Sequence, residues 1–238
     1  MNRLFAILGV TGLMVSGLAN QGHAAAVVID DFTEGTVDLL IRFGNAPNPA
    51  TSTEAVANVL GGERQATLFQ LPGGVTSSLF INPPEDRAAY GNLMAESIAT
   101  LTYDGAGNGG FSETDLTGGG TNEALVARLL SADAGVVLKY TLTDVMNNAF
   151  TQTMVTAGAV TNANVYFALN AFLGVDVTKI KSVVFSIEGG PGEVDADARF
   201  NFLGAVSAVP EPSTLAMFAF GGLGLIIAAR RRRQVVAV

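Results

Sequence analysis

The sequence contains no cysteine and no tryptophan, and its single histidine, His23, lies in a segment that we expect to be removed. Without cysteine there is no disulfide to brace the fold, and cysteine nucleophiles and Cys/His zinc sites are excluded. Without histidine in the mature chain, a Ser-His-Asp triad and a histidine general base are excluded as well. These absences favour a protein that is not an enzyme.

Charged residues are also scarce, at 14% of the 238 residues, and they are unevenly distributed. Residues 25–209 hold twenty acidic and eight basic side chains, a net charge of −12, whereas residues 210–238 hold four arginines and one glutamate. Nucleic acids and anionic membranes bind cationic surfaces, which displace their counterions. We therefore expect no nucleic-acid partner for this acidic body.

The first 24 residues have the layout of a secretory signal peptide. Arg3 supplies a positive start, residues 4–19 form an apolar run, and small residues flank the bond between Ala24 and Ala25. This pattern predicts export through the Sec translocon and cleavage by signal peptidase after Ala24. An uncleaved N-terminal anchor is the alternative.

The other end of the chain combines a Pro-Glu-Pro motif, an uncharged apolar segment and an arginine cluster. As a helix, residues 213–229 would span about 25 Å, near the lower limit for crossing a bilayer. The arginines should stay in the cytoplasm, because their transfer through hydrocarbon is costly. The motif residues are Val209, Pro210, Glu211, Pro212 and Ser213, and the stop-transfer residues are Arg230, Arg231, Arg232 and Arg233. The pattern predicts one transmembrane helix that holds the chain transiently in the inner membrane.

This order of motif, apolar segment and arginines resembles the PEP-CTERM sorting signal of bacteria that make exopolysaccharide. In that family an exosortase, a membrane cysteine protease, recognises the motif and removes the tail. The resemblance covers residues 207–238 and implies an exosortase substrate. Such a protein would end at the cell surface or in the extracellular matrix of a Gram-negative-type bacterium, either released or attached.

Between the two ends the hydrophobic pattern has a period of two residues, which is typical of β-strands. Turn-forming clusters rich in glycine separate these segments, at spacings that suit antiparallel pairing. The sequence therefore predicts an all-β fold, an antiparallel β-sandwich over residues 25–206. Expected strands cover residues 37–43, 66–71, 136–142, 164–169, 183–187 and 198–202.

Two short segments are predicted as minor helices, residues 51–60 with a capping box and residues 90–99. The body as a whole resembles exported jelly-roll domains of the galactose-binding-like type. Short motifs carry this resemblance, and they are Ile29-Asp30-Asp31-Phe32, Gly61-Gly62-Glu63-Arg64, Tyr103-Asp104-Gly105, Asp115-Leu116-Thr117 and the Asp-rich residues 195–202.

Two acidic groups and one arginine are candidates for a binding or catalytic site. Asp104, Asn108 and Asp115 flank a glycine-rich loop and either bind calcium through oxygen ligands or form an exposed turn with solvated acids. Asp195 and Asp197 would point the same way from one strand, as a carboxylate pair or as part of a solvated face.

Arg64 follows a pair of glycines and has two interpretations. Its planar guanidinium can bind a carboxylate or sugar hydroxyls, or it can form a structural ion pair within the sandwich. Neither interpretation requires a cofactor, so calcium is the only cofactor that the sequence indicates.

Three functions are compatible with these features. The first is a structural or interaction component of the exopolysaccharide or biofilm matrix, without enzymatic activity. The second is a carbohydrate-binding module, with or without calcium, although the lack of tryptophan removes the best ring for stacking on sugars. The third is a secreted glycan hydrolase that uses Asp195 and Asp197, which would need carboxylates about 5–10 Å apart.

Overall fold

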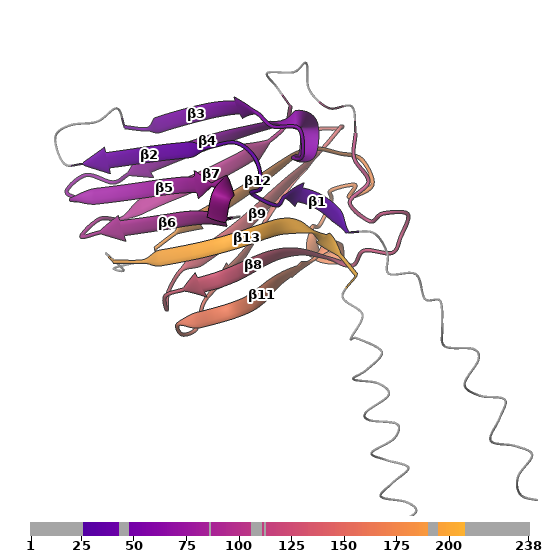
Figure 1. The fold of residues 1–238 in the computed structure, drawn as a ribbon. Coiled ribbons are helices and arrows are strands. Elements are labelled where there is room, and N and C mark those ends of the chain that lie inside the picture. Colours follow the sequence, from indigo (N-terminus) through magenta and orange to yellow (C-terminus); the bar gives the residue numbers. More distant parts are fainter. Residues whose placement is uncertain are drawn as a thin grey trace, which may run out of the picture. The chain divides into compact units, whose positions relative to one another are not determined.

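The structure of the protein is a computed structural model, and it describes residues 26–42, 48–85, 87–105, 111, 113–189 and 195–207. These residues form two β-sheets in which every strand pair is antiparallel (Figure 1).

Sheet A faces the viewer in Figure 1, and β1 pairs with the end of its long strand β13. In spatial order its strands are β11 (Val160–Ala168), β8 (Ala124–Ala132), β13 (Asp197–Val206), β6 (Arg87–Leu93), β5 (Thr76–Asn82) and β2 (Val37–Arg42), with β1 (Val27–Asp30) beside β13.

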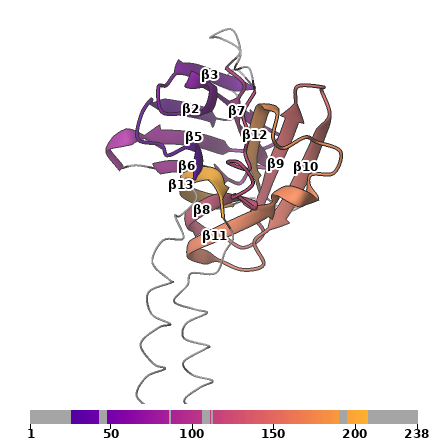
Figure 2. The same cartoon turned by 90° about the vertical axis from the view of Figure 1, so that its right-hand side faces the viewer.

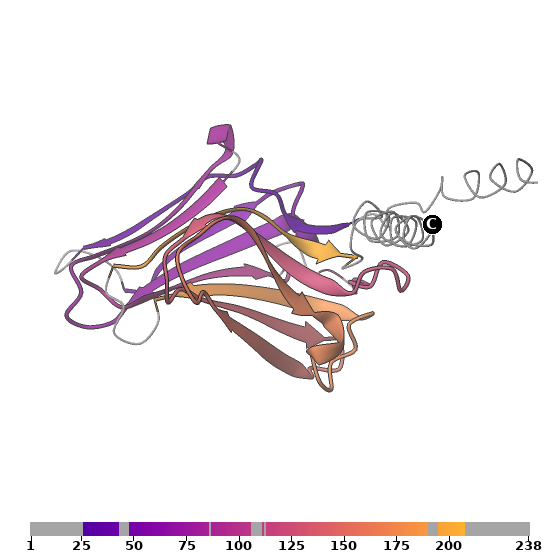
Figure 3. The same ribbon diagram turned by 90° about the horizontal axis from the view of Figure 1, so that it is seen from below.

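Sheet B forms the second layer of the sandwich (Figures 2 and 3). In spatial order its strands are β10 (Ala149–Val155), β9 (Val137–Asp144), β12 (Ile180–Glu188), β7 (Ser97–Tyr103), β4 (Glu63–Gln70) and β3 (Ala50–Ala55). Short 3-10 turns occur in the connections, at η1 (Leu60–Gly62), η2 (Pro83–Glu85) and η4 (Leu169–Ala171).

The chain alternates repeatedly between the two sheets, so that β2, β5, β6, β8, β11 and β13 belong to sheet A while β3, β4, β7, β9, β10 and β12 belong to sheet B. This arrangement confirms the predicted all-β antiparallel sandwich of the jelly-roll type. All six expected strands are present, as β2, β4, β9, β11, β12 and β13.

The two predicted helices are wrong. Residues 51–55 belong to β3, and only η1 in the following connection has helical hydrogen bonding. Residues 90–99 are divided between β6 and β7, with Met94 at a positive φ of 47° in the turn between them. In both segments burial alternates from residue to residue, so pairing with neighbouring strands has overridden local helix propensity.

A row of aromatic rings runs through the core between the sheets. Phe167 contacts Tyr140 at 5.0 Å between ring centroids, and Tyr140 contacts Phe185 at 4.9 Å. Phe185 contacts Phe200 at 5.4 Å, and Phe200 contacts Phe32 at 5.1 Å. All five side chains are buried, so these rings stabilise the sandwich and are not exposed for stacking on a ligand.

Candidate functional site

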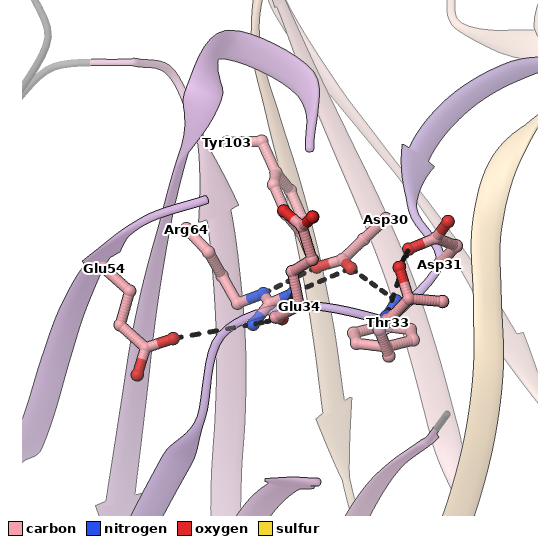
Figure 4. Close-up of polar contacts among 8 residues, drawn as sticks. Asp30, Asp31, Thr33, Glu34, Glu54, Arg64 and Tyr103 are labelled. Carbon is pink, nitrogen blue, oxygen red and sulfur yellow. Dashed lines mark hydrogen bonds and ion pairs between the residues drawn. The ribbon is translucent and has the colours of Figure 1, made fainter. Parts of the chain in front are cut away.

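Arg64 points from β4 into the interior and is fully buried (Figure 4). Its Nε donates to Asp30 Oδ2 at 2.6 Å, and its Nη2 donates to Asp30 Oδ1 at 2.8 Å, which makes a bidentate ion pair. Both terminal nitrogens also donate to the carbonyl oxygen of Glu34. The guanidinium therefore forms a structural ion pair inside the sandwich, which was one of its two predicted roles.

Other buried donors complete the surroundings of Asp30. The Tyr103 hydroxyl donates to Asp30 Oδ2 at 2.7 Å, and the Phe32 backbone N–H donates to Asp30 Oδ1 at 2.8 Å. Burial, together with the negative charge of Asp30, raises the pKa of Tyr103 well above its ordinary value. Tyr103 is thus a neutral hydrogen-bond donor at physiological pH, as the carboxylate of Asp30 requires.

Of the predicted calcium ligands, Asp104 directly follows β7 and Asp115 lies in the loop that precedes β8. The Asp115 carboxylate accepts hydrogen bonds from the hydroxyl and backbone N–H of Thr117 and from the backbone N–H of Gly119. The Thr117 hydroxyl is the main cause that lowers the pKa of Asp115. Asn108 lies outside the described residues, and within those residues no group of three or more His, Cys, Asp or Glu is placed to hold a metal ion.

Asp195 and Asp197 both line a groove on the outer face of sheet A, with a volume of about 290 Å³. The structure therefore places these two predicted residues at one site. Sequence reasoning missed the other lining residues, which are Thr76, Ser78, Gly91, Asn92 and Leu93.

The floor of the groove is made by β5 and β6. Strand alternation places Ser78 and Gly91 side by side on the outer face, and Gly91 lies opposite Asp197 on β13. A Cβ atom on Gly91 would lie 2.7 Å from Asp197 Oδ1 and 3.4 Å from Ser78 Oγ. Glycine is therefore required for the Asp197 carboxylate to lie across β6.

A buried polar network holds the segment that carries the two aspartates. Asn92, which is 6% exposed, donates its backbone N–H to the Ala196 carbonyl at 3.2 Å and accepts the Ala196 N–H through its side-chain oxygen. The Asn92 amide also donates to the Tyr90 hydroxyl, which donates to the Ser97 carbonyl. Both peptide groups of the residue between Asp195 and Asp197 are thus fixed to β6.

The groove is acidic. Burial is the main cause that raises the pKa of Asp197, and the negative charges of Asp133 and Asp195 add to it, while Arg199 opposes it. Asp195 Oδ1 accepts the backbone N–H of Met94 at 2.9 Å. The groove thus offers carboxylate and hydroxyl oxygens beside the apolar side chain of Leu93, a set of groups that suits hydrogen bonding to a polyhydroxylated ligand.

Comparison with known proteins identifies the end of the chain. Residues 208–233 match the PEP-CTERM protein-sorting motif, which confirms the predicted sorting signal. The match implies an exported protein that is processed by an exosortase. No curated protein sequence matches the chain.

The body is structurally similar to carbohydrate-binding jelly-roll modules. The family 11 module of the Clostridium thermocellum cellulase Lic26A-Cel5E is 8% identical, with 78% of this chain and 96% of that chain covered and a TM-score of 0.35. The family 30 module of the C. thermocellum cellulase Cel9D-Cel44B is 14% identical, with coverages of 72% and 99% and a TM-score of 0.34. An exo-β-agarase is 10% identical, with coverages of 77% and 26% and a TM-score of 0.39.

The remaining sequence predictions concern the two ends of the chain. The signal peptide with its cleavage site at Ala24 and Ala25, the motif at residues 209–213, the apolar segment and the arginines all lie outside the described residues. Among the described residues, no helix is long and apolar enough to cross a membrane.

Proposed function

We propose that this chain is an exported protein that an exosortase releases from the inner membrane, and that its sandwich domain binds polysaccharide without cleaving it. The observation that carries the location is the PEP-CTERM motif at residues 208–233. In this proposal the Sec translocon exports the chain and signal peptidase cleaves after Ala24. The mature protein then acts at the cell surface or in the exopolysaccharide or biofilm matrix.

The sorting step follows from the chemistry of the tail. The apolar segment at residues 213–229 enters the bilayer, and the four arginines behind it resist translocation. Proline disfavours helix, so we expect Pro210 and Pro212 to make this segment accessible to a protease. Cleavage near Pro210 would free the acidic body from its cationic anchor.

The groove on sheet A supports the proposal that the ligand is a polysaccharide. The Asp195 and Asp197 carboxylates can accept hydrogen bonds from sugar hydroxyls, and such charge-assisted bonds are stronger than neutral ones. Asn92 fixes the backbone of Ala196, between the two aspartates, before a ligand binds, which reduces the entropic cost of binding. The groove has a volume of about 290 Å³, near the lower end of the range for small-molecule sites, about 300–1,000 Å³.

A secreted glycan hydrolase is the second candidate, because one observation favours it. Asp197 has a raised pKa beside a second carboxylate, and a glycosidase acid requires such a shift. Release of reducing ends from the producer's exopolysaccharide, with loss of that release in both Asp195→Asn and Asp197→Asn, would establish hydrolysis. Binding without such release is the result that our proposal expects.

Filling the floor of the groove tests the binding site directly. Gly91→Ala places a methyl group 2.7 Å from Asp197 Oδ1 and should displace that carboxylate. We expect the affinity of the full chain in detergent for the producer's purified exopolysaccharide to fall about tenfold, equivalent to about 1.4 kcal/mol. Gly158→Ala is the matched control, because a Cβ there meets no atom within 4 Å. Equal affinities of the two variants would exclude the groove as the binding site.

Asp197→Asn is expected to weaken polysaccharide binding while raising the melting temperature at pH 7. Burial beside Asp133 disfavours the ionised carboxylate, so the folded-state pKa lies above the unfolded one. Wild-type stability should therefore fall as the pH rises from the unfolded-state pKa through the folded-state pKa, whereas the amide does not titrate. The melting temperatures of the wild type and of Asp197→Asn, measured from pH 3 to pH 7, should diverge as the pH rises. A difference that stays constant over this range would contradict the expectation.

A further inference from the structure

One side of the sandwich is built by a long stretch without charge. Residues 145–175 contain no Asp, Glu, Lys, Arg or His, which makes this run of 31 residues the longest of its kind in the chain. It includes β10, β11 and η4. Charged residues border it immediately on both sides, at Asp144 and Asp176.

Both strands in this stretch are edge strands. Among the described residues β10 pairs only with β9, and β11 pairs only with β8. Figure 2 shows β10 at the margin of sheet B and β11 at the margin of sheet A. An edge strand leaves alternate backbone N–H and C=O groups unpaired on its outer side, where they can pair with another strand.

The side chains on this margin also lack the features that usually protect an edge. Val155 on β10 is 58% exposed, and Tyr166 on β11 is 47% exposed. The margin on the other side of the sandwich differs, because β2 carries Asp38 and Arg42 and β3 carries Glu54. Charges on an edge strand oppose pairing with another chain, and only the β2 and β3 margin has them.

We propose that the uncharged margin, defined as β10 and β11, binds a second copy of this chain by edge-to-edge strand pairing. Two identical acidic bodies of net charge −12 repel each other, so their contact must lie where neither copy presents charge. The uncharged margin meets that requirement. Antiparallel pairing of β10 with β10 of the second copy is two-fold symmetric, so a single surface suffices for both partners.

The geometry can be tested with cysteine, because the chain has none of its own. Single cysteines at Thr151, Gln152, Thr153 and Met154 are introduced into the full chain in detergent, which is then oxidised mildly. A disulfide between the same position of two copies requires their Cα atoms to lie within about 7 Å. Two-fold pairing therefore predicts efficient cross-linking at one position, and no efficient cross-linking two residues before or after it. Thr51→Cys and Thr53→Cys on β3 are the controls, and we expect them to stay monomeric.

Association is measured independently by light scattering of the full chain during size-exclusion chromatography. We expect a protein mass of twice 24.5 kDa for the wild type and 24.5 kDa for Thr153→Lys combined with Thr161→Lys. Thr51→Lys combined with Thr53→Lys should keep the dimer mass, since these lysines lie on the opposite margin. A monomeric wild type, or a dimer that survives lysines at 153 and 161 but not at 51 and 53, would overturn the proposal. Cross-linking to a different protein only would do the same.

Discussion

Replacing Arg64 with methionine should lower the free energy of unfolding by about 3–5 kcal/mol, because it leaves the carboxylate of Asp30 charged and uncompensated in the core. Both side chains of this pair have no exposed surface. For a domain of this size the loss corresponds to a fall in melting temperature of roughly 6–20 °C. Thermal and urea unfolding of the variant would measure it.

The matched control is the same substitution at a half-exposed ion pair. Arg87 pairs with Glu85, and their side chains are 35% and 46% exposed. Arg87→Met should cost less than about 1 kcal/mol, because exposed pairs are screened by water. Equal losses for the two variants would show that breaking the buried pair costs no more than breaking an exposed one, which contradicts the expectation.

A second substitution isolates the buried charge. Asp30→Asn combined with Arg64→Met removes both charges while leaving an oxygen to accept from Tyr103 or Phe32. The double variant should therefore be more stable than Arg64→Met alone. A double variant that is less stable than Arg64→Met alone would show that the hydrogen bonds of Asp30 contribute more to stability than its pairing with Arg64.

Substitution of Glu211 by alanine is expected to abolish removal of the sorting tail. Glu211 is the charged residue of the Pro-Glu-Pro motif, within the residues that match the PEP-CTERM signal. Without recognition of the motif, the apolar segment and the arginines would keep the chain in the inner membrane. Intact mass of the protein from fractionated cells would measure the change, with mature termini expected near Ala25 and Pro210 in the wild type.

Two comparisons make this test specific. Glu85→Ala changes a glutamate that also follows a proline, but in the body of the chain, and it should be processed normally. A strain without the exosortase should retain the tail of the unaltered protein, as the Glu211→Ala variant does in the producing strain. Normal processing of Glu211→Ala, or retention of the tail by the wild type, would contradict the sorting proposal.

The groove illustrates why sequence patterns found only part of the candidate site. Asp195 and Asp197 were predicted as a pair because residues two positions apart on one strand share a face. The structure corrects the reason, because β13 begins at Asp197 and Asp195 lies before the strand. Asn92 is 104 residues from Ala196, which it fixes, and Gly91 lies opposite Asp197 only through the pairing of β6 with β13. No short-range pattern marks these partners, since they meet only after the strands have paired.

The amino-acid sequence by itself determined the strand-rich, antiparallel character of the body, its acidic charge and the sorting motif at its end. These properties depend on neighbours within a few residues, such as alternating burial, glycine in turns and the order of motif, apolar segment and arginines. Only the tertiary structure decided that Arg64 is buried against Asp30, that residues 51–55 form a strand, and that residues 90–99 are divided between β6 and β7. It also decided that Gly91 leaves room for the Asp197 carboxylate in the groove. Each of these outcomes depends on which distant strands become neighbours, and strand neighbours are selected by the packing of the whole sandwich.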